Sequence, residues 1–450
     1  MNMGKHAAFS FSSLDDLKRK AGELGASIPV REDISCLFRP ITLAGRRLSN
    51  RLAVQPMEGF DACPDGSPGD RTFRRYRRYA RGGSSLIWFE AAGVVSDGRS
   101  NPNQLMLTGS NRDSFRRLVE TARTEAKEAL GDSHEVFLIL QLTHSGRYSR
   151  PNGISAPRTA CLNPYLDKTS DPRQVLTDEE ILRLMDRFVE ASLWAEQAGF
   201  DAVDIKSCHG YLVSDLLAAH KRKHSNFGGT FENRTRFLLE TVDRIRRASK
   251  EIETCVRLSA FDGIPYPFGF GVSRTEPKEP DLAEPVELIR RLESLGCSLI
   301  NISVGNPALK PHMGRPFDRP AEGSGFSDEH PLEGVSRLLR ITGDLQKRFP
   351  GLSFVGTGYS WLRQFFPCVG AAVIDRGEAE FIGLGRSSFA YPDAPHDLKR
   401  TGRLDPRKVC TACSRCSELT RALHATGCVV RDIDPYGREY KRLFPRRRGF

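Results

Sequence analysis

The stretch TDEEILRLMDRFVEASLWAEQAGFDAVDIKSCHGYL, residues 177–212, contains one complete helix-to-strand unit of this chain. Thr177 followed by Glu180 is a capping-box pattern at the start of a helix predicted over residues 178–198. One face of that helix is apolar, through Ile181, Leu184, Met185, Phe188 and Val189. Gly199 ends the helix, and residues 202–206 are predicted to form a buried strand.

The same alternation of helix and strand runs through most of the chain. Eight short apolar segments are predicted as strands: residues 51–57, 85–91, 135–142, 202–206, 254–259, 298–303, 353–356 and 380–385. Helical patterns lie between them, for example at 287–295 and 361–376, and end at Gly296 and Gly377. Eight such units predict an α/β fold of the (β/α)₈ TIM-barrel class, with a doubly wound sheet as the alternative. Residues 1–35 are predicted to be a polar, helical N-terminal extension.

Composition and charge exclude several functional classes. Hydrophobic residues make up 39% of the 450 residues, which is enough for a sizeable buried core. The net charge is +11, but the arginines are scattered, and the densest runs, 71–81 and 446–448, lie in no nucleic-acid-binding motif. The first residues contain no apolar stretch long enough for the core of a signal peptide, and no run of 18 apolar residues occurs in the sequence. We therefore expect a cytoplasmic protein without nucleic-acid or membrane partners, whose basic surface suits an anionic cofactor or an acidic protein partner.

Polar side chains gather where the predicted strands end. In a barrel of this class the chemistry lies at the carboxyl ends of the strands, so these residues are expected at one rim. They are Pro56, Met57 and Glu58 at the end of the first strand, Gln141 on the third, Lys206, His209 and Tyr211 at the end of the fourth, and Arg257 on the fifth. Each alone fits a packing role, but their joint placement predicts an active site.

The last two predicted strands end in glycine-rich turns, at 356–358 and 383–385. Such loops commonly bind phosphate in (β/α)₈ barrels, because glycines let backbone N–H groups approach the oxygens. Gly358 and Gly385 are the candidate glycines, and Arg386 adds a positive charge. The simpler alternative is that these glycines only form tight turns.

Several of these motifs resemble the Old Yellow Enzyme family of NADH:flavin oxidoreductases. The matching segments are LFRP at 37–40, LSNRL at 48–52, QPM at 55–57, QLTHSGR at 141–147 and NFGGTFENRTRF at 226–237. The resemblance covers about residues 36–395 and is nearest to the barrels of 2,4-dienoyl-CoA reductase and trimethylamine dehydrogenase relatives. It implies FMN, with its ring system held by Pro56, Met57, Gln141 and Arg257 and its phosphate by Gly358, Gly385 and Arg386.

The resemblance also implies roles for the residues after the fourth strand. Lys206 and His209 match positions that bind the substrate's carbonyl or anionic oxygen, and Tyr211 matches a frequent proton donor to carbon. Two positions depart from the family pattern. Lys206 stands where many members have histidine, so a full ammonium would anchor the substrate. Glu58 stands where threonine or cysteine usually tunes the flavin, and a carboxylate there cannot donate a hydrogen bond unless it is protonated.

Four cysteines near the C-terminus follow a Cys-x₂-Cys-x₂-Cys-x₁₁-Cys pattern, and they are Cys410, Cys413, Cys416 and Cys428. Four thiolates that can converge suit a [4Fe–4S] cluster, whereas zinc sites more often show two separated Cys-x₂-Cys pairs. The spacing also resembles the cluster segment of the relatives named above. Zinc, and free or disulfide-forming cysteines, remain the alternatives.

The leading functional hypothesis is FMN-dependent reduction of an activated C=C bond in an unsaturated carbonyl compound, by hydride transfer from flavin N5, with NADH or NADPH as electron donor. The alternatives are oxidation of an amine or N-methyl compound through the iron–sulfur cluster, and a catalytically silent flavin-binding protein. We expect three parts: an N-terminal extension at 1–35, the FMN-binding barrel at 36–398 and the cysteine segment with a basic tail at 399–450. Because only 22 residues follow Cys428, no internal nucleotide-binding domain is expected, and a ferredoxin or flavoprotein is the expected electron carrier.

Overall fold

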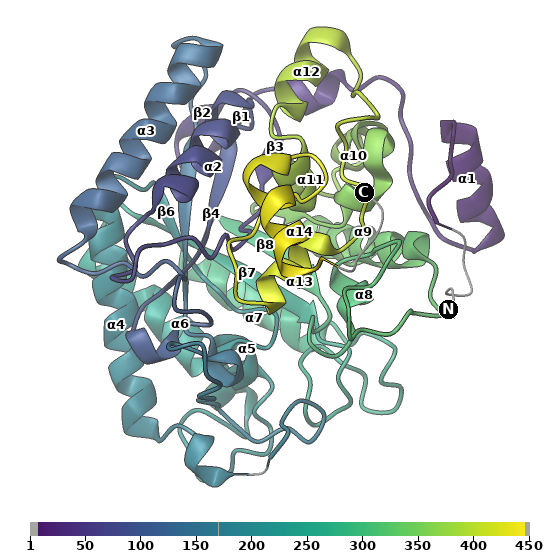
Figure 1. The fold of residues 1–450 in the computed structure, drawn as a ribbon. Helices are drawn as coiled ribbons and strands as arrows, with labels where there is room; N and C mark the ends of the chain where they lie inside the picture. Colours follow the sequence, from purple (N-terminus) through teal and green to yellow (C-terminus); the bar gives the residue numbers. More distant parts are fainter. Residues whose placement is uncertain (1–7, 170, 446–450) are drawn as a thin grey trace.

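The computed structural model describes residues 8–169 and 171–445, and its centre is a closed barrel of eight parallel strands (Figure 1). The strands are β3 (Leu52–Val54), β4 (Leu86–Gly93), β5 (Phe137–Thr143), β6 (Ala202–Ile205), β7 (Glu253–Phe261), β8 (Leu299–Val304), β9 (Ser353–Gly356) and β10 (Phe381–Leu384). They follow one another around the barrel in chain order, and β10 pairs with β3 to close it. The expected (β/α)₈ barrel is thus confirmed, and the doubly wound alternative is wrong.

Helices surround the barrel because each has one apolar face to bury. The larger ones are α2 (Asp70–Arg81), α3 (Arg112–Leu130), α4 (Asp178–Gln197), α6 (Phe231–Ala248), α7 (Ala283–Ser294), α9 (Pro331–Arg348) and α10 (Phe366–Asp375). The predicted capping box of α4 is present: Thr177 Oγ1 accepts from the Glu180 N–H at 3.2 Å, and Glu180 Oε2 accepts from the Thr177 N–H at 2.8 Å. Each bond satisfies a backbone donor that the helix itself leaves free.

The single helix expected at 361–376 is wrong in its first part. Residues Tyr359–Phe365 form a 3₁₀ segment, and α10 begins only at Phe366. Arg363 adopts φ 52° and ψ −125°, which interrupts the helical backbone. Pro367 lies in the first turn of α10, where its missing N–H costs no hydrogen bond of the helix. Apolar periodicity alone could not locate this break.

A hairpin that was not predicted closes the amino-terminal end of the barrel. It consists of β1 (Ile41–Leu43) and β2 (Arg46–Leu48), joined at Ala44 and Gly45, which both have positive φ. Leu43 and Leu48 are buried in one cluster with Trp88 of β4 and other residues at this end of the barrel. A binding cavity can therefore open only at the carboxyl-terminal end of the barrel.

The N-terminal region is helical only over α1 (Leu14–Glu23), so the expectation of a helical segment at 1–35 holds for part of its length; residues 1–7 lie outside the described residues. Leu17 and Ala21 bury the inner face of α1 in a cluster that also contains Trp361. Phe9 meets the same tryptophan edge to face at 5.1 Å. Within 8–169 and 171–445, no helix is long and apolar enough to cross a membrane.

The C-terminal segment includes α13 (Arg415–Arg421) and α14 (Arg438–Leu443), and it lies over the barrel beside α2 (Figure 1, yellow). The helix α12 (Ala394–Thr401) leads into it. Three arginines of α2 bind it. Arg71 contacts Glu439 at 2.6 Å, while Arg74 and Arg78 both contact the Asp432 carboxylate, at 2.7 and 2.5 Å. The basic run at 71–81 is therefore used for packing within the chain.

A buried ionic network fixes the loop after β3. Arg75 of α2 lies between Asp61 and Glu90, at 2.6 Å from each, and the three side chains are 4%, 4% and 1% exposed. Glu90 Oε2 also accepts from the Gly59 N–H at 2.6 Å, and the Gly59 carbonyl accepts from the Thr426 N–H at 2.6 Å. The loop that follows β3 is thereby held from the barrel and from the C-terminal segment together.

Candidate active site

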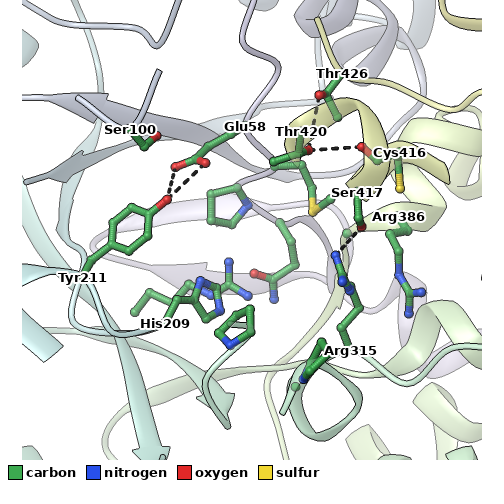
Figure 2. Close-up of a pocket in the computed structure, with 18 of the residues that line it drawn as sticks. Glu58, Ser100, His209, Tyr211, Arg315, Arg386, Cys416, Ser417, Thr420 and Thr426 are labelled. Carbon is green, nitrogen blue, oxygen red and sulfur yellow. Dashed lines mark hydrogen bonds between the residues drawn. The ribbon is translucent and has the colours of Figure 1, made fainter. Parts of the chain in front are cut away.

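A cavity of about 410 Å³ opens at the carboxyl ends of the strands, in the size range of small-molecule sites. All ten predicted cofactor-binding and catalytic residues line it: Pro56, Met57, Gln141, Lys206, His209, Tyr211, Arg257, Gly358, Gly385 and Arg386. The cavity continues to the C-terminal segment through Cys416, Ser417 and Thr420. Figure 2 shows Glu58 and Tyr211 on one side of this space, and Arg315, Arg386 and Cys416 on the other.

The floor of the cavity is organised by Asp204 of β6. Its Oδ2 accepts from Gln141 Nε2 at 2.6 Å and from Trp88 Nε1 at 2.8 Å, and its Oδ1 accepts from the Arg257 N–H at 2.6 Å. One of the two N–H donors of the Gln141 amide is thus used by Asp204, which leaves the other N–H and the carbonyl oxygen for a ligand. Asp204 therefore orients two of the predicted cofactor-binding residues at once.

The pH dependence of stability should report on Asp204. Burial raises the pKa of this carboxyl from 3.8 to about 6, so the folded state binds more protons than the unfolded state between these values. Its contribution to the free energy of unfolding is retained at low pH and should fall by about 3 kcal/mol as pH rises through this window. Between about pH 4 and pH 7, the free energy of unfolding measured in urea should fall by about 3 kcal/mol relative to that of the Asp204→Asn variant. An equal change of the free energy of unfolding in the two proteins would contradict this role.

Glu58, Lys206 and Tyr211 form a compact polar cluster on one side of the cavity. Lys206 Nζ donates to Glu58 Oε1 at 3.1 Å, and the Tyr211 hydroxyl donates to the same carboxylate at 3.2 and 3.3 Å. Lys206 Nζ also lies 3.5 Å from the centre of the Tyr211 ring. Burial raises the pKa of Tyr211 well above its ordinary value, and the Glu58 charge adds to this rise. Glu58 and Lys206, the two residues that depart from the family pattern, therefore form an ion pair with each other.

His209 lies at the turn after β6, with a positive φ of 66°. Its Nε2 is 3.0 Å from the Ser303 hydroxyl. Burial holds the pKa of His209 well below its ordinary value, and the charges of Arg257 and Lys206 act in the same direction. The imidazole is therefore neutral at physiological pH and has a single N–H to donate.

The opposite end of the cavity is lined by cationic and glycine-rich groups. Gly358 has φ +100°, which a side chain would disfavour, and a Cβ on Gly385 would lie 3.2 Å from the Met57 sulfur. Arg386 Nη1 and Arg315 Nε are buried and have no hydrogen-bond partner in the described part of the chain. Burial lowers the pKa of Arg315 to about 10, and the neighbouring Arg386 contributes. Two buried guanidiniums with donors to spare fit a phosphate group.

Arg315 was not predicted from the sequence. It lies after β8, just beyond the short helix α8 (Pro311–Gly314), in a segment whose apolar spacing indicates no element. Arg315 also bonds to the Ser417 hydroxyl of the C-terminal segment. Its place in the cavity depends on that long-range contact, for which a single sequence carries no signal.

The four predicted cysteine ligands lie together in the C-terminal segment. Burial raises the pKa of Cys410 to about 11 and that of Cys428 to about 12, and nearby thiols of the same group add to both. Backbone N–H groups bond to two of the sulfurs, from Ala412 to Cys410 at 3.4 Å and from Arg431 to Cys428 at 3.3 Å. However, no three His, Cys, Asp or Glu side chains among the described residues are arranged to hold a single metal ion.

Residues 36–269 match the NADH:flavin oxidoreductase / NADH oxidase family. The chain belongs to this family. It is 28% identical over 386 residues to an NADH oxidase of Thermoanaerobacter brockii, covering 84% of this chain and 52% of that protein. An NADPH dehydrogenase of a Geobacillus strain is 30% identical over 273 residues, covering 60% of this chain and 73% of that protein. The family resemblance found in the sequence is thereby confirmed.

Among solved structures, a 2-naphthoyl-CoA reductase in complex with 2-naphthoyl-CoA matches with a TM-score of 0.70 and 20% identity, over 91% of this chain and 59% of that one. At 20% identity, this match shows that the two chains share a fold and shows nothing about a shared activity. The chain spans about half the length of the NADH oxidase relative.

Proposed function

We propose that the protein is an FMN-dependent reductase that uses NADH or NADPH to reduce an activated C=C bond of an unsaturated carbonyl compound. The observation that carries this proposal is a single cavity that is lined both by Lys206, His209 and Tyr211 and by Gln141 and Arg257. Family membership supports flavin and nicotinamide chemistry. The oxidation of amines, the runner-up from the sequence, gains no comparable support from the cavity.

The residues present fit FMN in both charge and shape. Gln141 would accept a hydrogen bond from the flavin pyrimidine edge, and Arg257 would stabilise negative charge on the reduced ring. Pro56 and Met57 would support the ring system. Gly358, Gly385 and Arg386 would take the phosphate, and we add Arg315 to this set because of its spare buried donors. Bound FMN would supply the hydride.

The chain's own residues would orient and protonate the substrate. The Lys206 ammonium has two N–H bonds left after its contact with Glu58, and these can bind the substrate oxygen together with the His209 N–H. Such donors stabilise the negative charge that develops on that oxygen. Tyr211 would then give its proton to the carbon next to the carbonyl.

Deuterium transfer tests the proposed reaction. The holoenzyme would be supplied with 4-deuterated NADPH or NADH and 2-cyclohexenone under anaerobic conditions. We expect cyclohexanone with deuterium at the β-carbon. A flavin that is bleached by simple amines instead, with no saturated ketone formed, would favour amine oxidation and contradict the proposal.

We further propose that Cys410, Cys413, Cys416 and Cys428 hold a [4Fe–4S] cluster. Their spacing and the N–H bonds to the sulfurs of Cys410 and Cys428 support this, because ligating thiolates need neutralising donors. Electrons would then be exchanged with a carrier such as a ferredoxin or flavoprotein.

Removing one ligand should remove the iron. Cys413→Ser is expected to lower the iron content of anaerobically purified protein from about four atoms per chain to nearly none, while FMN is retained. Cys63→Ser is the matched control, since Cys63 is partly buried but has no ligand spacing. Iron and zinc analysis of both variants decides the matter; zinc in place of iron in the wild type would contradict the cluster.

Two further proposals concern the division of the chain and its location in the cell. We propose the division into an extension at 1–35, a barrel at 36–398 and a cysteine segment at 399–450. A cytoplasmic location is supported by the eleven cysteines, which all lie within the described ranges and form no disulfide there.

A further inference from the structure

The Glu58 carboxylate lies between a cation and a phenol. Its Oε1 accepts from Lys206 Nζ at 3.1 Å and from the Tyr211 hydroxyl at 3.2 Å, so one oxygen joins both donors. The side chains of Lys206 and Glu58 are only 5% and 14% exposed. Figure 2 shows the Glu58 carboxylate and the Tyr211 hydroxyl directed at each other. The three groups thus form a continuous hydrogen-bonded chain at the edge of the cavity.

This arrangement matters once Tyr211 has given up its proton. The resulting phenolate would be buried and would lie next to the Glu58 carboxylate, so two adjacent anions would share a low-dielectric site. Burial and the Glu58 charge already raise the pKa of Tyr211 well above its ordinary value. The phenolate therefore needs rapid reprotonation from a group within hydrogen-bond reach.

We propose that Glu58 relays a proton from Lys206 to Tyr211 after each reduction, and the relay rests on the proposed function. Tyr211 loses its O–H bond as a C–H bond forms on the substrate, and the electron pair of the hydride comes from the nicotinamide through the flavin. The Lys206 N–H bond then breaks, the proton passes across Glu58 Oε1, and a new O–H bond forms on Tyr211. A proton taken up from the solvent then restores the Lys206 ammonium, so that each cycle consumes one hydride and one solvent proton. Glu58 acts through Tyr211 and is a positioning residue.

The neighbours of this cluster supply no equivalent route through Glu58. Lys206 is the cationic side chain in ion-pair contact with Glu58 within the described residues. Gln104 Nε2 also approaches Glu58 Oε1, at 3.5 Å, but an amide has no readily lost proton. Ser100 lines the same cavity as Tyr211, and its hydroxyl is the competing proton route.

Glu58→Gln keeps the size and an acceptor oxygen but cannot carry the proton. In the holoenzyme under steady-state turnover with NADPH, where Tyr211 must be reprotonated in every cycle, we expect the rate of 2-cyclohexenone reduction, divided by the rate with ferricyanide, to fall about tenfold to hundredfold. Ferricyanide takes electrons without a proton at carbon, so this ratio isolates the proton step. Glu58→Asp, which keeps the carboxylate, should restore most of the ratio. Ser100→Ala is the matched test of the competing route.

A second readout is spectroscopic and does not depend on rate alone. Infrared difference spectra during a single turnover of the wild type should show a transient carboxylic acid band, which must be absent in Glu58→Gln. Enone reduction with an unchanged ratio in Glu58→Gln, or a loss seen only in Ser100→Ala, would overturn the relay and leave the proposed function intact. A wild type that reduces no enone would contradict both.

Discussion

Tyr211→Phe is expected to slow reduction of the C=C bond by about 10² to 10⁴-fold, the range for loss of a general acid. The substitution removes the hydroxyl that would protonate carbon and leaves the ring in place. Tyr211 donates its hydrogen bond to Glu58 and to none of the residues expected to hold FMN, so the cofactor should remain bound. Stopped-flow reoxidation of the reduced holoenzyme by 2-cyclohexenone measures the effect directly.

The flavin content of the Tyr211→Phe variant is the control. A slow reaction together with lost FMN would show that the ring or hydroxyl supports the cofactor site. Turnover that is fully retained with every enone tested would contradict the role of Tyr211 as proton donor.

Arg75→Met is expected to destabilise the fold by about 3–5 kcal/mol, the cost of leaving buried charges without their partner. Arg75 is 4% exposed and bonds to Asp61 and Glu90, which are 4% and 1% exposed. Without the guanidinium, two buried carboxylates would face each other. Urea unfolding at neutral pH measures the loss.

Arg77→Met is the matched control from the same helix. Arg77 is 50% exposed and pairs with Glu125 on the surface, so its loss should cost less than about 1 kcal/mol. Equal effects of the two substitutions would contradict the special place of the Arg75 network. Because this network binds the Gly59 N–H, Arg75→Met should also weaken flavin binding.

The fold could be predicted largely from local signals. The strand-helix alternation and the α4 capping box are properties of adjacent residues, and both are confirmed. The β1–β2 hairpin was missed because strands of three residues are too short to show a period. The break at Arg363 was missed because an unusual backbone angle leaves no trace in apolar spacing.

In the candidate site, too, features set by local sequence could be predicted and features set by long-range contacts could not. Residues at strand ends, such as Gln141 and Tyr211, could be placed at the cavity because barrel geometry brings strand ends together. The pairing of Glu58 with Lys206 joins residues 148 positions apart, and the contact of Arg315 with Ser417 joins residues 102 apart. Long-range side-chain contacts of this kind depend on how the folded chain packs, and no local pattern in a single sequence predicts them. The use of the 71–81 arginines to bind the C-terminal segment is a further example.

The most direct test of the central proposal is an anaerobic two-step titration of the purified holoenzyme, followed by its visible absorption. Addition of NADPH or NADH should bleach the flavin bands, and 2-cyclohexenone should restore them with one saturated ketone formed per flavin. Protein that contains no flavin, or a bleached flavin that no enone reoxidises, would contradict the account.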